Sequence, residues 1–324
     1  MLAATTTTQL APATLTADLQ HAAALVGLSK AGNTKRVYAS CWRSFAAYCT
    51  ANDLCAWPAT PAAVAAYLSR LDADGKTHST CTVHRAAIGA AHRYADPPQE
   101  DPTSASVVQL VMDGIARSRG IAPRRQAAAI LPDQVRKVID SCDRSVDGVR
   151  DRAMISLWYA AGLRRSDVAS LTSGCIGWHD RGAIITIPRS KGDQKGLGQS
   201  VPLLDGEITT WLREWQRIVD ADSERRGLSV ASRPLFVGLR DGARLSAGAC
   251  VAIFQRRAKA VGVSGMVGHS LRAGLATNAA RQGVGLLKIS RMLRHKSMDT
   301  TRRYVRQQEQ WDDAFDAPLP RGER

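Results

Sequence analysis

A segment rich in proline and arginine, GIAPRRQAAAILPDQ at residues 120–134, separates two parts of the chain with different patterns. Proline lacks a backbone N–H and opposes a continuous helix or a central strand, so neither part is expected to run through this segment. A chain of 324 residues is also long for a single hydrophobic core. We therefore predict two domains joined by a linker at residues 121–130.

The part before the linker is predicted to be a helical domain over residues 30–120. Apolar residues at spacings of four, three and four predict its first helix: Tyr38, Trp42, Phe45 and Cys49. A second helix is predicted to begin at Thr60 and Pro61, a capping residue followed by proline at the first helical position. Two more are predicted, over about 81–94 and, after the break DPPQEDP, over about 104–116. The Thr/Ala-rich residues 1–29 are predicted to be a flexible leader.

The part after the linker, residues 131–306, combines helix and strand patterns. A mostly apolar run over 151–163 predicts a buried helix. The β-branched segment GAIITIPRS and the segment QSVPLL predict two strands of a hairpin joined by the turn-rich GDQKGLG. Helices are predicted to resume over 207–219, 246–261, 269–282, 285–294 and 298–305. The expected fold class is mainly α with a small antiparallel β-sheet.

Composition narrows the classes of function. The chain has 44 basic and 29 acidic side chains, a net charge of +15, and most of the excess follows residue 120. Such an excess favours a polyanionic partner, although a basic surface also serves solubility. The seven cysteines are scattered and form no Cys-x-x-Cys, which predicts reduced thiols in an intracellular protein. No apolar run reaches the 18 residues that a membrane-spanning helix needs, so no membrane partner is predicted.

Six polar residues fall at the ends of predicted elements in the second part. They are Arg164 after the apolar helix, Lys191 in the hairpin, His269 and Arg272 in GHSLRAG, His295 at a helix end, and Tyr304. Each has an ordinary explanation when taken alone. An arginine near a helix C-terminus complements the helix dipole, and a lysine in a hairpin loop is commonly solvated. Their order along the chain is more informative than any one of them.

In this order the residues resemble the tyrosine recombinase (phage integrase) family. The resemblance is seen in AAGLRRSDVASL, IPRSKGDQKGLGQSVPL, GHSLRAGLATNAA and MLRHKSMDTTRRYV. It covers residues 131–306 as a mixed α/β catalytic domain, and the four preceding helices resemble the family's core-binding, SAM-like domain. It implies a site-specific DNA recombinase that cuts and rejoins strands through a covalent 3′-phosphotyrosine, in the integration, excision or resolution of mobile DNA.

The resemblance gives each residue a role that its chemistry suits. Two guanidinium groups, those of Arg164 and Arg272, are expected to hold the non-bridging oxygens of the scissile phosphate through charge-assisted hydrogen bonds. Tyr304 is the expected nucleophile, and its phosphotyrosine conserves the bond energy needed for rejoining. Lys191 is expected to protonate the expelled 5′ oxygen. His269 and His295 are expected to accept the tyrosine proton or to hold phosphate oxygens.

At two positions the sequence departs from the usual family pattern, and at a third it offers an alternative catalytic residue. Asp167 stands where family members more often have glutamate, and we expect it to support Arg164 or its helix. Arg294 precedes the second histidine, where glycine is usual, and it is expected to add a cation near the phosphate. Lys195 lies in the same hairpin as Lys191 and is the alternative general acid.

The resemblance also implies partners and assembly. We expect double-stranded DNA with paired recombinase sites, a homo-tetramer in the synaptic complex, an accessory DNA-bending or directionality protein, and a cytoplasmic, nucleoid-associated location. No cofactor or metal is implied. The chain is predicted to be a short form without an arm-binding domain. In the tail, residues 307–324, Trp311 and Phe315 are expected to pack either on a neighbouring protomer or within the same chain.

Three other classes of protein share some of these features. A type IB topoisomerase would use the same chemistry as a monomer, but the helical first domain and the tail favour a recombinase. A DNA-binding relative without catalysis would not require Tyr304. A general RNA-binding protein would be expected to have aromatic-rich strands, which the sequence lacks.

Overall fold

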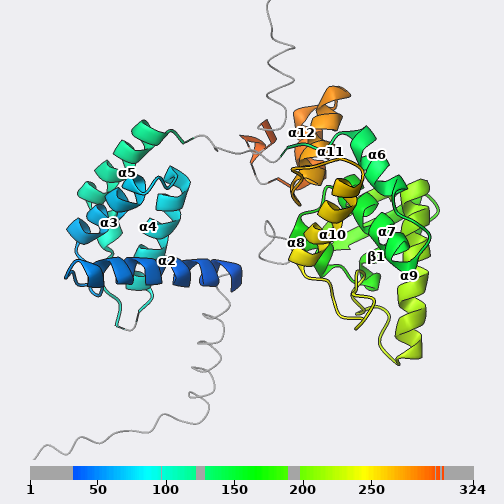
Figure 1. The fold of residues 1–324 in the computed structure, drawn as a ribbon, viewed down its shortest axis with the longest axis horizontal. Coiled ribbons are helices and arrows are strands. Elements are labelled where there is room, and N and C mark those ends of the chain that lie inside the picture. Colours follow the sequence, from blue (N-terminus) through cyan, green and yellow to red (C-terminus); the bar gives the residue numbers. More distant parts are fainter. Residues whose placement is uncertain are drawn as a thin grey trace, which may run out of the picture. The chain divides into compact units, whose positions relative to one another are not determined.

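A helix of the first part of the chain begins where its capping residue predicts, at Pro61 after Thr60. The computed structural model of the protein describes residues 32–95, 97–121, 128–188, 198–295, 297–299 and 301–302. It divides the chain into two units, Met1–Arg124 and Arg125–Arg324 (Figure 1). The helices of the first unit are α2 (Gly32–Ala51), α3 (Pro61–Ala73), α4 (His78–Arg93) and α5 (Ser106–Arg119), with the short 3₁₀ helix η1 (Pro102–Ser104) before α5.

In the first unit, local capping and apolar spacing account for the helices. The Thr60 side chain accepts a hydrogen bond from the backbone N–H of Ala63 at 3.2 Å, so α3 begins at the expected Thr-Pro pair. Along α2, Phe45 and Cys49 are buried, as their spacing predicts. They join a hydrophobic core with side chains from α3, α4 and α5. The four-helix prediction for this region therefore holds.

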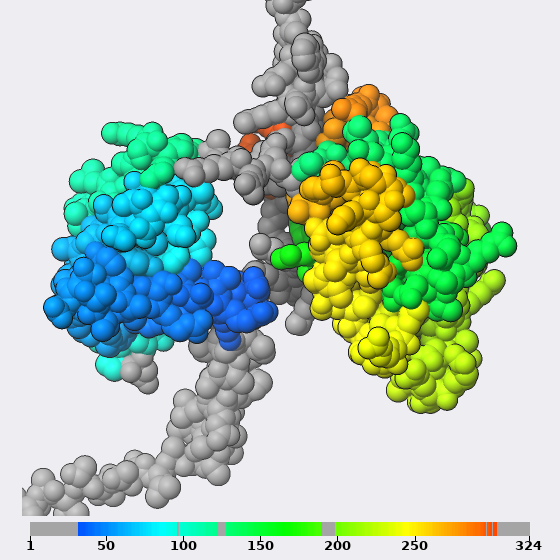
Figure 2. Space-filling view, viewed as in Figure 1, coloured from blue at the N-terminus to red at the C-terminus, as the bar shows by residue number. Residues whose placement is uncertain are grey.

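The second unit is built around α7 (Val146–Ala160), which is buried on most sides. It packs against α6, α8, α9, α10 and α11. The bounds of the other helices are α6 (Pro132–Asp140), α8 (Arg165–Ser170), α9 (Glu207–Arg225), α10 (Ala247–Ala260), α11 (Ser270–Arg281) and α12 (Leu286–Leu293). The atoms of α10 and its flanking loops, yellow in Figure 2, form much of one face of this unit.

Two helix predictions in this unit need correction. The helix expected over 151–163 begins earlier, at Val146, because the Ser145 side chain caps it by accepting the Gly148 N–H at 3.1 Å. It also ends earlier, because the chain turns at Gly162 with a φ of 53°. The six-residue helix α8 was not predicted, since so short a segment shows no clear period.

The sheet has one strand more than the sequence predicts. Strands β1 (Ile176–His179), β2 (Gly182–Ile187) and β3 (Gln199–Leu204) are antiparallel in the order β1-β2-β3. Ile185 of β2 pairs with Ile176 on one side and Val201 on the other. β1 was missed because its four residues are too few to show alternation. The predicted fold class, mainly α with a small antiparallel sheet, is confirmed.

Two glycines of GHSLRAG serve close packing of α11. A Cβ at Gly268 would lie 2.7 Å from Val251 Cγ2, and a Cβ at Gly274 would lie 2.2 Å from the carbonyl oxygen of Ile130. The N–H of Ile130 in turn donates to the carbonyl of Ser270 at 3.3 Å. The segment entering the second unit therefore lies directly on α11.

The thiols of the described residues are free, and their exposure differs. The seven cysteines are free; six are buried and Cys55 is exposed. Among the helices of the described residues, none has the length and apolar character needed to cross a membrane.

Packing at Gly274 gives a test of this arrangement. Gly274→Ala should lower the free energy of unfolding by about 2 kcal/mol, because the added methyl group overlaps backbone that cannot move freely. Gly114→Ala, in the interior of α5 with no atom near its added Cβ, should instead raise the free energy of unfolding by about 1 kcal/mol. Urea denaturation measures both variants, and equal effects would contradict the packing.

Candidate active site

Arg164 lies at the end of a tight turn between α7 and α8. Gly162 has a φ of 53°, and a Cβ there would lie 2.8 Å from Leu293 Cδ2 and 2.9 Å from Leu275 Cδ2. Both the backbone angle and the close side chains therefore favour glycine. Two residues on, Arg164 is extended, and its N–H donates to the Asp167 carboxylate at 3.0 Å. This bond fixes where the Arg164 side chain starts.

The Arg164 guanidinium contacts the protein, while part of its side chain remains exposed to solvent. Its Nη2 donates to the carbonyl oxygen of Arg294 at 3.2 Å, and its Nη1 lies 3.9 Å from Asp167 Oδ2. Nη1 is buried and has no hydrogen-bond partner among the described residues. Since 21% of the side chain remains exposed, Arg164 offers a cation with a donor suited to an incoming anion.

Arg272 and His269 come from the start of α11. Arg272 is fully buried, and its guanidinium donates to the carbonyl oxygens of Gly162 and Leu293. It thus joins the α7–α8 turn to the end of α12. His269 precedes the first residue of α11 and remains exposed.

His295 follows directly after α12. The chain leaves that helix at Arg294, which has a left-handed φ of 55°. His295 Nδ1 then lies 2.8 Å from the hydroxyl oxygen of Thr301, a fully buried side chain. The hydroxyl fixes the orientation of the imidazole ring.

The Arg294 side chain is buried, although its position before the second histidine predicts a cation near the phosphate. Its side chain is only 4% exposed, and its guanidinium donates to the carbonyl oxygens of Ala161 and Gly162, each at 3.0 Å. It also lies 3.6 Å from Asp167 Oδ2. The cation is therefore near Arg164, but it contacts the protein interior.

The two histidines have lowered pKa values. Burial first, and then the positive charges of Arg272 and Arg164, lower the pKa of His295 to about 3. For His269, the loss of water on the side that faces the protein lowers the pKa, followed by the charges of the same two arginines. Both rings are therefore mainly neutral at pH 7, and the four side chains lie within electrostatic reach of one another.

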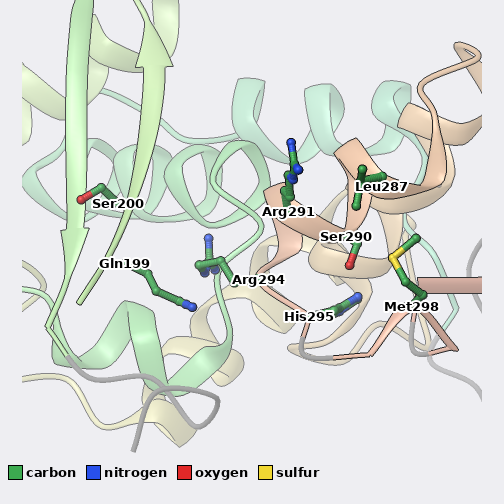
Figure 3. Close-up of a pocket in the computed structure, with 8 residues that line it drawn as sticks. All are labelled: Gln199, Ser200, Leu287, Ser290, Arg291, Arg294, His295 and Met298. Carbon is green, nitrogen blue, oxygen red and sulfur yellow. The ribbon is translucent and has the colours of Figure 1, made fainter. Parts of the chain in front are cut away.

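A pocket of about 520 Å³ opens beside His295. Figure 3 shows Gln199, at the start of β3, extending towards α12, with His295 and Met298 on the opposite side. Arg291 and Arg294 add basic groups to its lining. The pocket therefore lies between the hairpin strand and the segment that carries the second histidine.

The structure brings together Arg164, Asp167, His269, Arg272 and His295. Lys191 and Tyr304 lie outside the described residues, as do Lys195, Trp311 and Phe315. Among the described residues, no group of three or more His, Cys, Asp or Glu side chains is placed to hold a metal ion.

The sequence did not single out Gly162 or Thr301. A glycine just after an apolar helix is a typical C-terminal signal, so Gly162 was within reach of sequence analysis. No spacing or composition rule distinguishes Thr301, whose role beside His295 depends on its buried position.

Comparisons with known proteins identify the family. The sequence pattern of the phage integrase family matches residues 129–310. The integrase/recombinase XerD homolog of Selenomonas ruminantium is 30% identical over 288 residues, which cover 86% of this chain and 83% of that protein. The recombinase Cre of Escherichia phage P1 is 28% identical over 291 residues, which cover 85% of this chain and 84% of that protein.

A solved structure shares the fold. The integrase of the Tn1549 transposon, in complex with transposon right end DNA, is similar with a TM-score of 0.61 at 14% identity. The match covers 88% of this chain and 95% of that chain. The fold and these relatives define a tyrosine-type site-specific DNA recombinase, the class predicted from the sequence. The chain belongs to the phage integrase family.

The lowered pKa of His295 predicts a pH effect on stability. In the unfolded chain this histidine takes up a proton near pH 6.5, whereas in the folded protein it does so only at about 3. Between these values the unfolded state binds more protons, so the free energy of unfolding falls as the pH falls from 6.5 towards 3. His295→Asn keeps a polar atom near Thr301 but does not titrate, and it should flatten this dependence. Urea denaturation at several pH values measures it, and profiles of equal slope would contradict the assignment.

Proposed function

We propose that the protein cuts and rejoins DNA strands with Tyr304 as the nucleophile and Arg164, Lys191, His269, Arg272 and His295 as the other catalytic residues. The observation that supports this most is the convergence of two arginines and two neutral histidines around the Gly162 turn. Arg164 lies more than 100 residues before the other three, so their meeting is a property of the fold.

The arginines supply the electrostatic part of the reaction. Attack on a phosphodiester increases the negative charge on the non-bridging oxygens, and fixed cations in a site of restricted water stabilise that charge. The Arg164 side chain is 21% exposed, so its positive charge is accessible to a phosphate oxygen. Arg272 contributes its charge and holds the turn before Arg164 in place.

The remaining residues supply the nucleophile and transfer protons. The Tyr304 oxygen attacks phosphorus and gives its proton to a neutral histidine, His269 or His295. The bond between phosphorus and the 5′ oxygen breaks, and Lys191 protonates that oxygen. A 3′-phosphotyrosine remains, and attack by a 5′ hydroxyl reverses these steps, so rejoining needs no external energy source.

DNA is the expected partner of both domains. We propose that residues 30–120 bind DNA as the core-binding domain, that 131–306 form the catalytic domain, and that 121–130 link them. The net charge of +15 supports a polyanionic partner, and the Tn1549 integrase was solved with DNA. The proposal also includes a synaptic homo-tetramer on paired sites, an accessory DNA-bending or directionality protein, and a nucleoid-associated location. The tail at 307–324 packs either on a neighbouring protomer or within the same chain.

Removal of the tyrosine hydroxyl tests the nucleophile. Tyr304→Phe should abolish covalent adducts and leave DNA affinity nearly unchanged, because only the attacking oxygen is lost. Nicked suicide duplexes tiled across the DNA that flanks the gene are incubated with each protein and resolved on denaturing gels. An adduct formed by the variant would refute the role of Tyr304. Bound but uncleaved DNA with the wild-type protein would favour a relative without catalysis.

Removal of Arg164 tests the electrostatic role. Arg164→Ala should slow adduct formation by about 100-fold to 1,000-fold, because a donor to the phosphate is lost. Arg165→Ala removes the same charge one residue later, at the exposed start of α8. It should weaken DNA binding in low salt and leave the cleavage rate of bound DNA close to that of the wild type. Single-turnover cleavage at saturating protein separates the two, and equal rates for both variants would count against Arg164.

A further inference from the structure

Arg294 combines two unfavourable features at one position. Its φ of 55° is left-handed, which a residue with a Cβ adopts at a cost and glycine adopts freely. Its side chain is also a cation with only 4% of its surface exposed. Burial lowers the pKa of this guanidinium, and the nearby Asp167 carboxylate opposes that effect. A residue that tolerates both strain and burial calls for a functional explanation.

Most contacts of the Arg294 side chain are with the segment that carries Arg164, and its Nη1 also donates to the carbonyl oxygen of Met292 at 3.4 Å. Its guanidinium donates to the carbonyl oxygens of Ala161 and Gly162, just before Arg164. Its own carbonyl oxygen accepts from Arg164 Nη2 at 3.2 Å. The carbonyl contact is available to any residue at this position, but the guanidinium contacts require arginine.

Asp167 lies between the two arginines. Its carboxylate is fully buried, with Oδ2 3.6 Å from Arg294 Nη2 and 3.9 Å from Arg164 Nη1. The same oxygen accepts the backbone N–H of Arg164 at 3.0 Å. One buried negative charge thus faces two cations, and the nearer one is Arg294.

We propose that Arg294 is a positioning residue that neutralises Asp167, so that the positive charge of the partly exposed Arg164 side chain remains available to the DNA phosphate. Without Arg294, the buried carboxylate has only Arg164 as a nearby cation, and the two form a closed ion pair. Arg164 then binds its neighbour in place of the scissile phosphate. This inference rests on the proposed function, because it assigns Arg294 a part in the same reaction.

A charge-rescue experiment tests the proposal. Arg294→Gly removes the guanidinium, keeps the carbonyl group and relieves the left-handed strain, so it is the variant least expected to misfold. It should slow single-turnover adduct formation by on the order of tenfold or more, on the duplex that the wild-type protein cleaves. Adding Asp167→Asn removes the unbalanced charge while its amide oxygen still accepts the Arg164 N–H. The double variant should recover most of the lost rate.

Rescue distinguishes the proposed role from a purely structural one. If Arg294 only fills space and bonds carbonyls, the losses from Arg294→Gly and Asp167→Asn should add, because each removes a buried partner. Arg294→Lys offers a second test, since it keeps a positive charge beside Asp167 but lacks the fork that binds two carbonyls. It should retain clearly more activity than Arg294→Gly.

Arg233 provides a matched control. It is also buried, at 8% exposure, and donates to a carboxylate, that of Asp222, at 3.0 Å. Arg233→Met should lower the thermal unfolding midpoint without slowing cleavage by the folded protein. DNA affinity of each variant, measured in the Tyr304→Phe background, should stay within about threefold of its parent, because binding depends on many phosphate contacts.

The outcomes separate this inference from the proposed function. Rescue of Arg294→Gly by Asp167→Asn, together with activity in Arg294→Lys, supports the neutralising role. Additive losses, or a lysine variant as slow as the glycine variant, overturn it while the recombinase mechanism stands. A wild-type protein that forms no adduct on any duplex refutes the proposed function, and this inference with it.

Discussion

Two guanidinium groups, those of Arg272 and Arg294, donate to one carbonyl oxygen, that of Gly162. Burying a cation is costly unless hydrogen bonds replace its water, and here backbone carbonyls from the α7–α8 turn and the end of α12 take that place. The carbonyl of a turn is therefore the common attachment of α11 and the segment after α12. The placement of Arg164 and His295 depends on it.

The same arrangement concentrates positive charge. Arg164 and Arg294 share a single buried carboxylate, Asp167, in the described part of the site, and Arg272 adds a third cation beside the Gly162 carbonyl. Burial first, and then this surplus of positive charge, lowers the pKa of both histidines and leaves them neutral. An anion placed among these cations acts in the opposite direction, because a nearby negative charge favours the protonated imidazole. The arrival of a phosphate and the readiness of a histidine to accept a proton are thus linked by simple electrostatics.

Sequence patterns predicted the parts of this protein that depend on local chemistry. Thr60 and Pro61 fixed the start of α3, and the β-branched run predicted β2 and its partner β3. β1 and α8 were missed because four and six residues are too short for a period to appear. The order of the polar residues predicted the family.

The contacts within the site could not be predicted from the sequence. Arg164, Arg272 and Arg294 carry the same group, and only the fold decides which guanidinium is buried and which retains exposure. Arg294 was expected to add a cation near the phosphate, and its guanidinium binds the carbonyl oxygens of Ala161 and Gly162. Such contacts join segments about 130 residues apart, which no local rule relates.

Because the other thiols are buried, the protein has one cysteine that a reagent in solution can reach. Of the seven cysteines only Cys55, in the first unit, is exposed. A maleimide dye applied to the native protein is thus directed to one position, because the buried thiols are shielded from the reagent. The unaltered chain can carry one fluorophore on its helical unit, far in sequence from every proposed catalytic residue. Movements of that unit on DNA can then be followed by fluorescence without replacing any natural cysteine.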